Sequence, residues 1–240
     1  MTIAITMTVN NRPKYLRQVL DALMANLIPL GEDYVLLPSV EPPTAQSLEH
    51  ISDEIRNILN NVEFSTCFPY YHTVQQGCNR NTHHAMKRGF DYADKIIHLE
   101  DDLLPAQDFL IYNTLMLKRF KDSNIVAIGS WNSEVSYCDE MISRRNMFCS
   151  WGVATWKNRW PTLEHMFKKT GCSNEGIAWD TVLDNEFRRN NYYSIIPSMC
   201  RVRNIGKEGG TWMSAAQWDK MGYHPWMGDD ELCTHYELED

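Results

Sequence analysis

The first 130 residues alternate between short apolar, β-branched runs and segments in which apolar residues recur at helical spacing. This alternation is typical of α/β proteins, in which helices connect the strands of a mostly parallel sheet. The predicted strands are Thr2–Val9, Tyr34–Val40, Val62–Phe68, Lys95–Leu99 and Ile125–Gly129. Helices are expected between them, over residues 13–23, 48–59, 79–93 and 108–120. The sequence therefore predicts a mostly parallel central sheet flanked by helices.

After Ser130 the regular alternation ends. The segment SWGVATWKNRW, residues 150–160, predicts a turn at Trp151-Gly152 and a short helix from Ala154 to Trp160, which Pro161 ends. Further along, a helix is expected over residues 176–190, a strand over 192–197 and a basic, glycine-containing loop over 201–211. There is no internal repeat and no low-complexity linker. We therefore expect one domain over residues 1–240, with halves at 1–130 and 131–240.

The stretch KIIHLEDDLL, residues 95–104, places three carboxylates directly after a predicted buried strand. Ligands bind at the carboxyl ends of strands in open α/β sheets. Three adjacent acids are costly to bury without partners, because desolvation penalises their charged form. A divalent cation together with a phosphorylated ligand would satisfy Glu100, Asp101 and Asp102. A solvated acidic turn before a helix is the alternative interpretation.

Composition excludes several classes of protein. The net charge of -8 leaves no basic excess for binding nucleic acid. No apolar run reaches the roughly 18 residues that span a membrane, and the N-terminus does not have the pattern of a signal peptide. Seven cysteines, with none in a CxxC pair, favour reduced thiols over a disulfide framework or a zinc site. We therefore expect a cytoplasmic protein, and peripheral membrane association remains open.

Four segments, in order along residues 2–212, stand out. They are TMTVNNRPKYLRQVLDAL, GCNRNTHHAMKRGFDYADKIIHLEDDLLPAQDFL, SWGVATWKNRW, and AWDTVLDNEF followed by IIPSMCRVRNIGKEGG. Together they resemble the inverting glycosyltransferases of the GT-A fold, in particular the bacterial family 2-like enzymes, with features of the N-acetylglucosaminyltransferase I type. This resemblance implies a Rossmann-like nucleotide-sugar transferase fold, with a donor-binding half at 1–130 and an acceptor-binding half at 131–240.

The resemblance also implies roles for the acids. Glu100-Asp101-Asp102 takes the place of the Asp-x-Asp-type metal motif, with Asp102 as the ligand of Mn²⁺ or Mg²⁺. Glu100 and Asp101 are expected to face the ribose hydroxyls or to bind the metal through water. Asp180 is the expected general base that takes the proton of the acceptor hydroxyl, and Asp184, one helical turn later, is the second choice.

Further contacts to the donor are expected from residues at strand ends and helix starts. Asn10, Arg12 and Arg80 are predicted to contact the nucleotide; for the two arginines the reason is that a guanidinium suits phosphate. Glu41 is predicted to accept a hydrogen bond from an N–H of the nucleobase. Arg203, with Arg201, is expected in a mobile loop that folds over the diphosphate. Two residues are predicted to line the acceptor or donor-sugar pocket, Trp151 and Gly152, and His224 is a possible further metal ligand.

The predicted partners are a UDP- or GDP-sugar donor and a saccharide or glycoconjugate acceptor, as in polysaccharide biosynthesis, with no nucleic acid. Three alternatives remain at this point, and one of them is a hydrolase with acids as its only catalytic feature. A sugar-nucleotide pyrophosphorylase would want a glycine-rich loop after the first strand, and NNRPKY contains no glycine. A non-catalytic nucleotide- or carbohydrate-binding module would be expected to lose one of the key acids, and both Asp102 and Asp180 are present.

Overall fold

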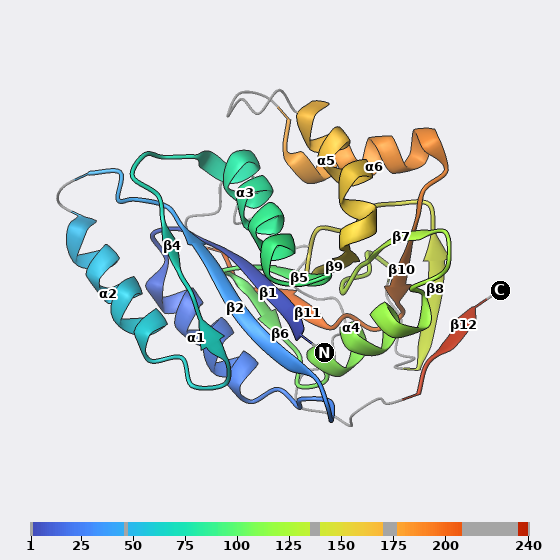
Figure 1. The fold of residues 1–240 in the computed structure, drawn as a ribbon, viewed down its shortest axis with the longest axis horizontal. Helices are drawn as coiled ribbons and strands as arrows, with labels where there is room; N and C mark the ends of the chain where they lie inside the picture. The colour runs from blue at the N-terminus through green and yellow to red at the C-terminus, as the bar shows by residue number, and fades with distance from the viewer. Residues whose placement is uncertain (1, 46–47, 135–139, 170–176, 208–234, 240) are drawn as a thin grey trace.

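A computed structural model describes residues 2–45, 48–134, 140–169, 177–207 and 235–239 (Figure 1). His224, predicted as a possible further metal ligand, lies outside these ranges. The rest of residues 213–234 also lies outside them. Most of the described strands form one large sheet with helices on both faces (Figure 1). No helix within these ranges is both long and apolar enough to cross a bilayer.

The main sheet has ten strands in the order β12-β8-β10-β7-β9-β5-β1-β2-β3, with β4 also paired to β2. Their bounds are β1 Thr2–Val9, β2 Asp33–Val40, β3 Thr66–Cys67, β4 Tyr70–Tyr71, β5 Lys95–Glu100, β7 Ile125–Ile128, β8 Met141–Arg145, β9 Val153–Trp156, β10 Tyr193–Pro197 and β12 Glu237–Glu239. A separate two-stranded sheet pairs β6, Leu103–Pro105, with β11, Val202–Asn204. The predicted α/β architecture with a mostly parallel sheet is confirmed.

The helices divide into two groups that cover opposite faces of the sheet (Figure 1). On one face lie α1, Pro13–Met24, α2, Glu49–Asn60, and α4, Phe109–Arg119. On the other lie α3, Gly77–Tyr92, α5, Trp160–Lys169, and α6, Trp179–Asn190. Helix α1 shows why such helices form: Pro13 occupies its first turn, where a missing N–H costs nothing. Its buried residues recur at helical spacing and face the sheet, namely Leu16, Val19, Leu20 and Leu23.

The register of the central strands determines where the polar strand ends meet. Strand β1 runs parallel to both neighbours, so that Thr8 pairs with Glu100 of β5 on one side and with Ser39 of β2 on the other. The three strands therefore end at the same edge of the sheet. The residues that follow them, Asn10, Glu41 and Asp101, come together at this edge although they are far apart in the sequence.

The predicted helix from Ala154 to Trp160 is wrong. Val153–Trp156 instead forms β9, which lies antiparallel between β5 and β7, with all four residues buried. A 3-10 turn, Lys157–Arg159, follows, and α5 begins at Trp160. The physical reason is that helices cover both faces of the sheet here. The strand is therefore buried on both sides, and its residues show no apolar–polar alternation that distinguishes a strand from a buried helix.

Candidate functional site

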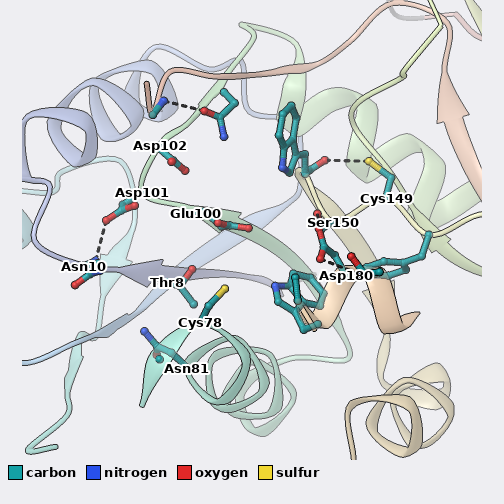
Figure 2. Close-up of a pocket in the computed structure, with 18 of the residues that line it drawn as sticks. Thr8, Asn10, Cys78, Asn81, Glu100, Asp101, Asp102, Cys149, Ser150 and Asp180 are labelled. Atoms are coloured by element: carbon teal, nitrogen blue, oxygen red, sulfur yellow. Dashed lines mark hydrogen bonds between the residues drawn. The ribbon is translucent and has the colours of Figure 1, made fainter. Parts of the chain in front are cut away.

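A cavity of about 1060 Å³ opens at the sheet edge where β1, β2 and β5 end (Figure 2). The start of α3, the loop before β9 and the start of α6 complete its walls. Its size is at the upper end of the range for small-molecule sites, about 300–1,000 Å³. Most of the predicted site residues are among those that line it: Asn10, Arg12, Glu41, Glu100, Asp101, Asp102, Trp151 and Asp180.

The two aspartates after β5 are held by the turn after β1. The Asn10 backbone N–H donates to Asp101 Oδ2 at 2.8 Å. The Arg12 guanidinium donates to both acids, through Nη2 to Asp101 Oδ1 and through Nη1 to Asp102 Oδ2, the latter at 2.6 Å. Burial opposes the charge of this guanidinium, but Asp101 and Asp102 raise the pKa of Arg12 above its usual value. The turn NNRP therefore contacts the acids directly.

Glu100 is the half-buried acid at the end of β5. In Figure 2 its carboxylate lies between the pair Asp101 and Asp102 and the carboxylate of Asp180 across the cavity. Burial raises the pKa of Glu100 to about 8, and the nearby charges of Asp102 and Asp180 act in the same direction. Burial also raises the pKa of Asp101, to about 6. Burial and neighbouring acids thus disfavour the charged forms of these carboxylates, and a bound cation would favour them again.

Asp102 has capacity left for a metal ion. Its Oδ1 is buried and has no hydrogen-bond partner among the residues that the structure describes, although a buried carboxylate oxygen normally has one. Within those same residues, no group of three or more His, Cys, Asp or Glu side chains is arranged to hold a metal by itself. Mg²⁺ and Mn²⁺ fit such a site when one or two carboxylates act together with substrate phosphates and water.

Asp180 is positioned by the start of α6. The buried Trp179 precedes it, and the Trp179 backbone N–H donates to Asn79 Oδ1 at 2.9 Å, which ties this end of α6 to α3. Ser150 Oγ donates to Asp180 Oδ2 at 3.4 Å, and the Thr181 N–H donates to Oδ1 at 2.8 Å. Asp180 remains half-buried at the wall of the cavity. Its carboxylate is therefore oriented but accessible.

Asp184 is more fully engaged than Asp180. Its Oδ1 accepts the Phe148 N–H at 2.9 Å, and its Oδ2 accepts Arg188 Nε at 2.9 Å. These contacts anchor the loop before β9 to α6. Asp180 is thus better placed than Asp184 to accept a proton, and Asp184 holds the loop before β9 in position through the Phe148 N–H.

Two buried polar side chains lie at the end of the cavity beside β2. Glu41 Oε2 accepts the Gln76 N–H at 2.9 Å, while its Oε1 is buried and has no partner in the described structure. Burial raises the pKa of Glu41. Asn81 Nδ2 donates to the Ser39 carbonyl at 3.2 Å, which fixes the orientation of its amide. This end of the cavity can recognise hydrogen-bond donors of a ligand.

Unlike Arg12, the other three arginines that were predicted to contact or cover the diphosphate are not among the residues that line the cavity. Arg80 is exposed on α3 and Arg203 is exposed on β11, and neither lines the cavity. The expectation that Arg201 belongs to a mobile loop is wrong, because its side chain is 0% exposed and its Nε donates to Asp108 Oδ2 at 2.9 Å. A buried arginine requires such a partner, and the partner here lies 93 residues away in the sequence.

Gly152, next to Trp151 in the chain, also lies outside the cavity lining. It has a φ of 66°, in the left-handed region, and a Cβ at this position would meet Ser130 Cβ at 2.8 Å and Phe109 Cε2 at 2.9 Å. Glycine is therefore required for the close packing of the turn before β9. The neighbouring Trp151 packs against Trp131, with ring centroids 4.8 Å apart, and both rings line the cavity.

The Gly152→Ala variant is expected to lose about 2–4 kcal/mol of unfolding free energy, because left-handed strain and overpacking add together. Gly31→Ala is the matched control: its φ is 77°, but a Cβ there would have no heavy atom within 4 Å. That variant is expected to lose only about 1–2 kcal/mol. Urea unfolding of both proteins measures the difference, and equal losses would contradict the packing role of Gly152.

Several cavity-lining residues were missed from the sequence, namely Gln75, Cys78, Asn81, Trp131, Ser150, Asn204 and Gly206. Cys78 and Asn81 lie one helical turn apart at the start of α3, so their shared face was a usable signal. Gly206 gave no such signal. It packs against Asp102 so closely that a Cβ would overlap with the Asp102 carboxylate.

No protein-family model matches the sequence, and no curated protein is similar to it. Solved structures are similar in fold. Residues 1–349 of TarS from S. aureus have a TM-score of 0.53 at 13% identity, covering 84% of this chain and 59% of that chain. The same TarS segment in complex with UDP-GlcNAc has a TM-score of 0.53 at 12% identity, covering 92% of this chain and 64% of that chain.

A third similar structure is the mannosyltransferase PcManGT from Pyrobaculum calidifontis in complex with GDP-Man and Mn²⁺. It has a TM-score of 0.52 at 15% identity, covering 87% of this chain and 58% of that chain. The chain thus spans less than two thirds of the length of each of these three structures. At such low identity the similarity concerns the fold, and the GT-A fold expected from the sequence is confirmed.

Proposed function

We propose that this chain is a metal-dependent inverting glycosyltransferase, which moves a sugar from a nucleotide-diphosphate donor to a hydroxyl of a saccharide or glycoconjugate acceptor. The observation that carries the proposal is the cavity itself. Glu100, Asp101 and Asp102 lie on one wall at the strand ends, and Asp180 lies on another at the start of α6 (Figure 2). The similar structures TarS and PcManGT are described with UDP-GlcNAc and with GDP-Man and Mn²⁺, which supports a donor of this class.

Donor binding would use the three strand ends. Glu41 offers its unpartnered Oε1 to an N–H of the nucleobase. Asp101 and Glu100 would accept hydrogen bonds from the ribose hydroxyls. Arg12 lines the cavity and pairs with the acids, and its side chain is still 20% exposed. Its guanidinium suits a diphosphate oxygen.

The metal would be held by Asp102, which has an unpartnered buried oxygen, with the diphosphate completing most of the ligand set. A bound Mn²⁺ or Mg²⁺ supplies charge stabilisation to the departing nucleoside diphosphate. Asp101 and Asp102 together carry more negative charge than the paired Arg12 offsets, and the remaining negative charge attracts a cation. Asp101 and Asp102 are almost completely buried, and the low dielectric around them strengthens these interactions.

Proton transfer would fall to Asp180. In direct displacement the acceptor hydroxyl attacks the anomeric carbon from the face opposite to the leaving diphosphate, and a base must take the hydroxyl proton. The Ser150 and Thr181 hydrogen bonds orient the Asp180 carboxylate without consuming all of its acceptor capacity. The paired rings of Trp131 and Trp151 form an apolar wall on which a sugar ring of the acceptor or donor can stack.

A thermal-shift panel of nucleotide sugars with Mn²⁺ tests the proposal. We expect a UDP- or GDP-sugar to raise the melting temperature by several degrees at ligand concentrations about 100 times the Kd. The corresponding free sugars and nucleosides, which lack the diphosphate, are expected to have little effect. Absence of a shift with every nucleotide sugar in the panel would contradict donor binding.

Product analysis with the best donor separates the alternatives. A transferase releases a nucleoside diphosphate, whereas a pyrophosphorylase consumes pyrophosphate and forms a nucleoside triphosphate. A non-catalytic binding module would bind the donor and release neither product. We expect release of the nucleoside diphosphate, increased by the correct acceptor.

A further inference from the structure

The guanidinium of Arg12 lies between the two aspartates that follow β5. It donates to Asp101 Oδ1 and to Asp102 Oδ2, and it contacts both at ion-pair distance. The two carboxylates are almost completely buried, with side chains 1% and 7% exposed. Arg12 itself is 20% exposed and belongs to the turn between β1 and α1. One positive charge of the chain therefore already offsets part of the charge of these two acids.

Gly206 closes another side of the same aspartate. The Ile205 N–H donates to the Asp102 backbone carbonyl at 2.8 Å, and Gly206 packs directly on the carboxylate. Between Arg12 and Gly206, Asp102 keeps an unpartnered Oδ1 that is shielded from solvent. A cation therefore reaches this Oδ1 only if one of these neighbours moves.

We propose that Arg12 is an internal counter-ion that keeps divalent cations off Asp101 and Asp102 until the nucleotide donor binds. The donor diphosphate gives the guanidinium a second anionic partner, and the acids are then free for the metal. This inference rests on the proposed function, because it assumes that the donor and the cation share this cavity. It adds that cation and nucleotide binding are coupled through one side chain.

The coupling follows from charge and geometry. A guanidinium and a divalent cation repel each other strongly at neighbouring positions in a partly buried site, so both cannot bind the same carboxylate oxygen. Moving Arg12 to the diphosphate exchanges one charge-assisted fork for another of similar strength. The carboxylates then retain a cationic partner, because the metal replaces the guanidinium. Coupling of this kind is reciprocal: nucleotide must strengthen cation binding by the same factor as the cation strengthens nucleotide binding.

The test is the affinity of the nucleotide-free protein for Mn²⁺, measured from the free-ion electron paramagnetic resonance signal. The Arg12→Gln variant is expected to bind Mn²⁺ at least about tenfold more tightly than the wild type, the scale of one charge-assisted hydrogen bond. Arg12→Lys, which keeps a single charge but not the fork, should show a smaller gain. Arg80→Gln is the matched control, because it removes the same charge from an exposed position outside the cavity lining, and no gain is expected.

The same titrations in the presence of UDP and of GDP distinguish this inference from the proposed function. We expect one nucleotide to strengthen Mn²⁺ binding in the wild type, and to do so less in Arg12→Gln. Equal or weaker Mn²⁺ binding by nucleotide-free Arg12→Gln would overturn the counter-ion role, even where the wild type shows coupling. If neither nucleotide affects Mn²⁺ binding by the wild type, the proposed donor site itself is contradicted. Circular dichroism confirms folding, and Arg12→Lys provides the comparison if Arg12→Gln does not fold.

Discussion

Replacing Asp180 with asparagine is expected to lower the rate of sugar transfer by about a hundredfold or more while leaving donor affinity within a few-fold of the wild type. Asparagine has almost the same shape and can keep the contact with Ser150, so the start of α6 should not move. It cannot take a proton at neutral pH, however. Single-turnover transfer kinetics and calorimetric donor binding together measure this separation of chemistry from binding.

Asp184→Asn is the matched control on the same helix. Asp184 accepts the Phe148 N–H and pairs with Arg188, so its substitution is expected to cost about 1 kcal/mol of stability and to leave the chemical step largely intact. Retained turnover in Asp180→Asn would contradict its role as the base and move that role to Asp184 or elsewhere. A loss of turnover confined to Asp184→Asn would assign the role to Asp184.

Asp102→Asn is expected to abolish the effect of Mn²⁺ on nucleotide binding. Asparagine leaves a neutral carbonyl where the proposed metal ligand was, and a single neutral oxygen holds a hard divalent cation weakly. In calorimetric titrations, the wild type should bind the nucleotide with a ratio of affinities, with Mn²⁺ to without Mn²⁺, of at least about ten. The ratio should be close to one for the variant.

Asp101→Asn provides the comparison for this variant. Asp101 is covered by the Asn10 N–H and by Arg12 and is proposed to support the donor rather than to bind the metal directly. It should therefore keep most of the dependence on Mn²⁺, although its donor affinity falls. If Asp101→Asn loses the metal dependence and Asp102→Asn keeps it, Asp101 is the metal ligand.

The elements predictable from the sequence are those with a local pattern. Strand β1 and helix α1 follow directly from β-branched alternation, a proline in the first helical turn and apolar spacing. Strand β9 was mistaken for a helix, because Val153–Trp156 is buried on both faces and short buried runs have no period of their own. Its position between β5 and β7 depends on pairing partners that only the folded sheet brings together.

The candidate site likewise contains residues that a local sequence pattern identifies and residues whose role depends on distant contacts. The acids at residues 100–102 were recognisable because charge directly after a buried strand is costly without a ligand. The pairing of Arg201 with Asp108 was not predictable, since the burial of an arginine depends on a distant residue. The same is true of Asp184, whose partner Phe148 contributes only a backbone N–H. Sequence patterns thus indicated which strand ends carry chemistry, while long-range contacts decide which charges are free to act.

The most direct test of the central claim is calorimetric titration of the wild-type protein with UDP and with GDP, once with Mn²⁺ and once with EDTA. The account predicts that one of the two nucleotides binds in Mn²⁺ and loses at least about tenfold in affinity when the metal is chelated. Equal affinity in the two solutions would contradict a metal-assisted donor site at Asp102.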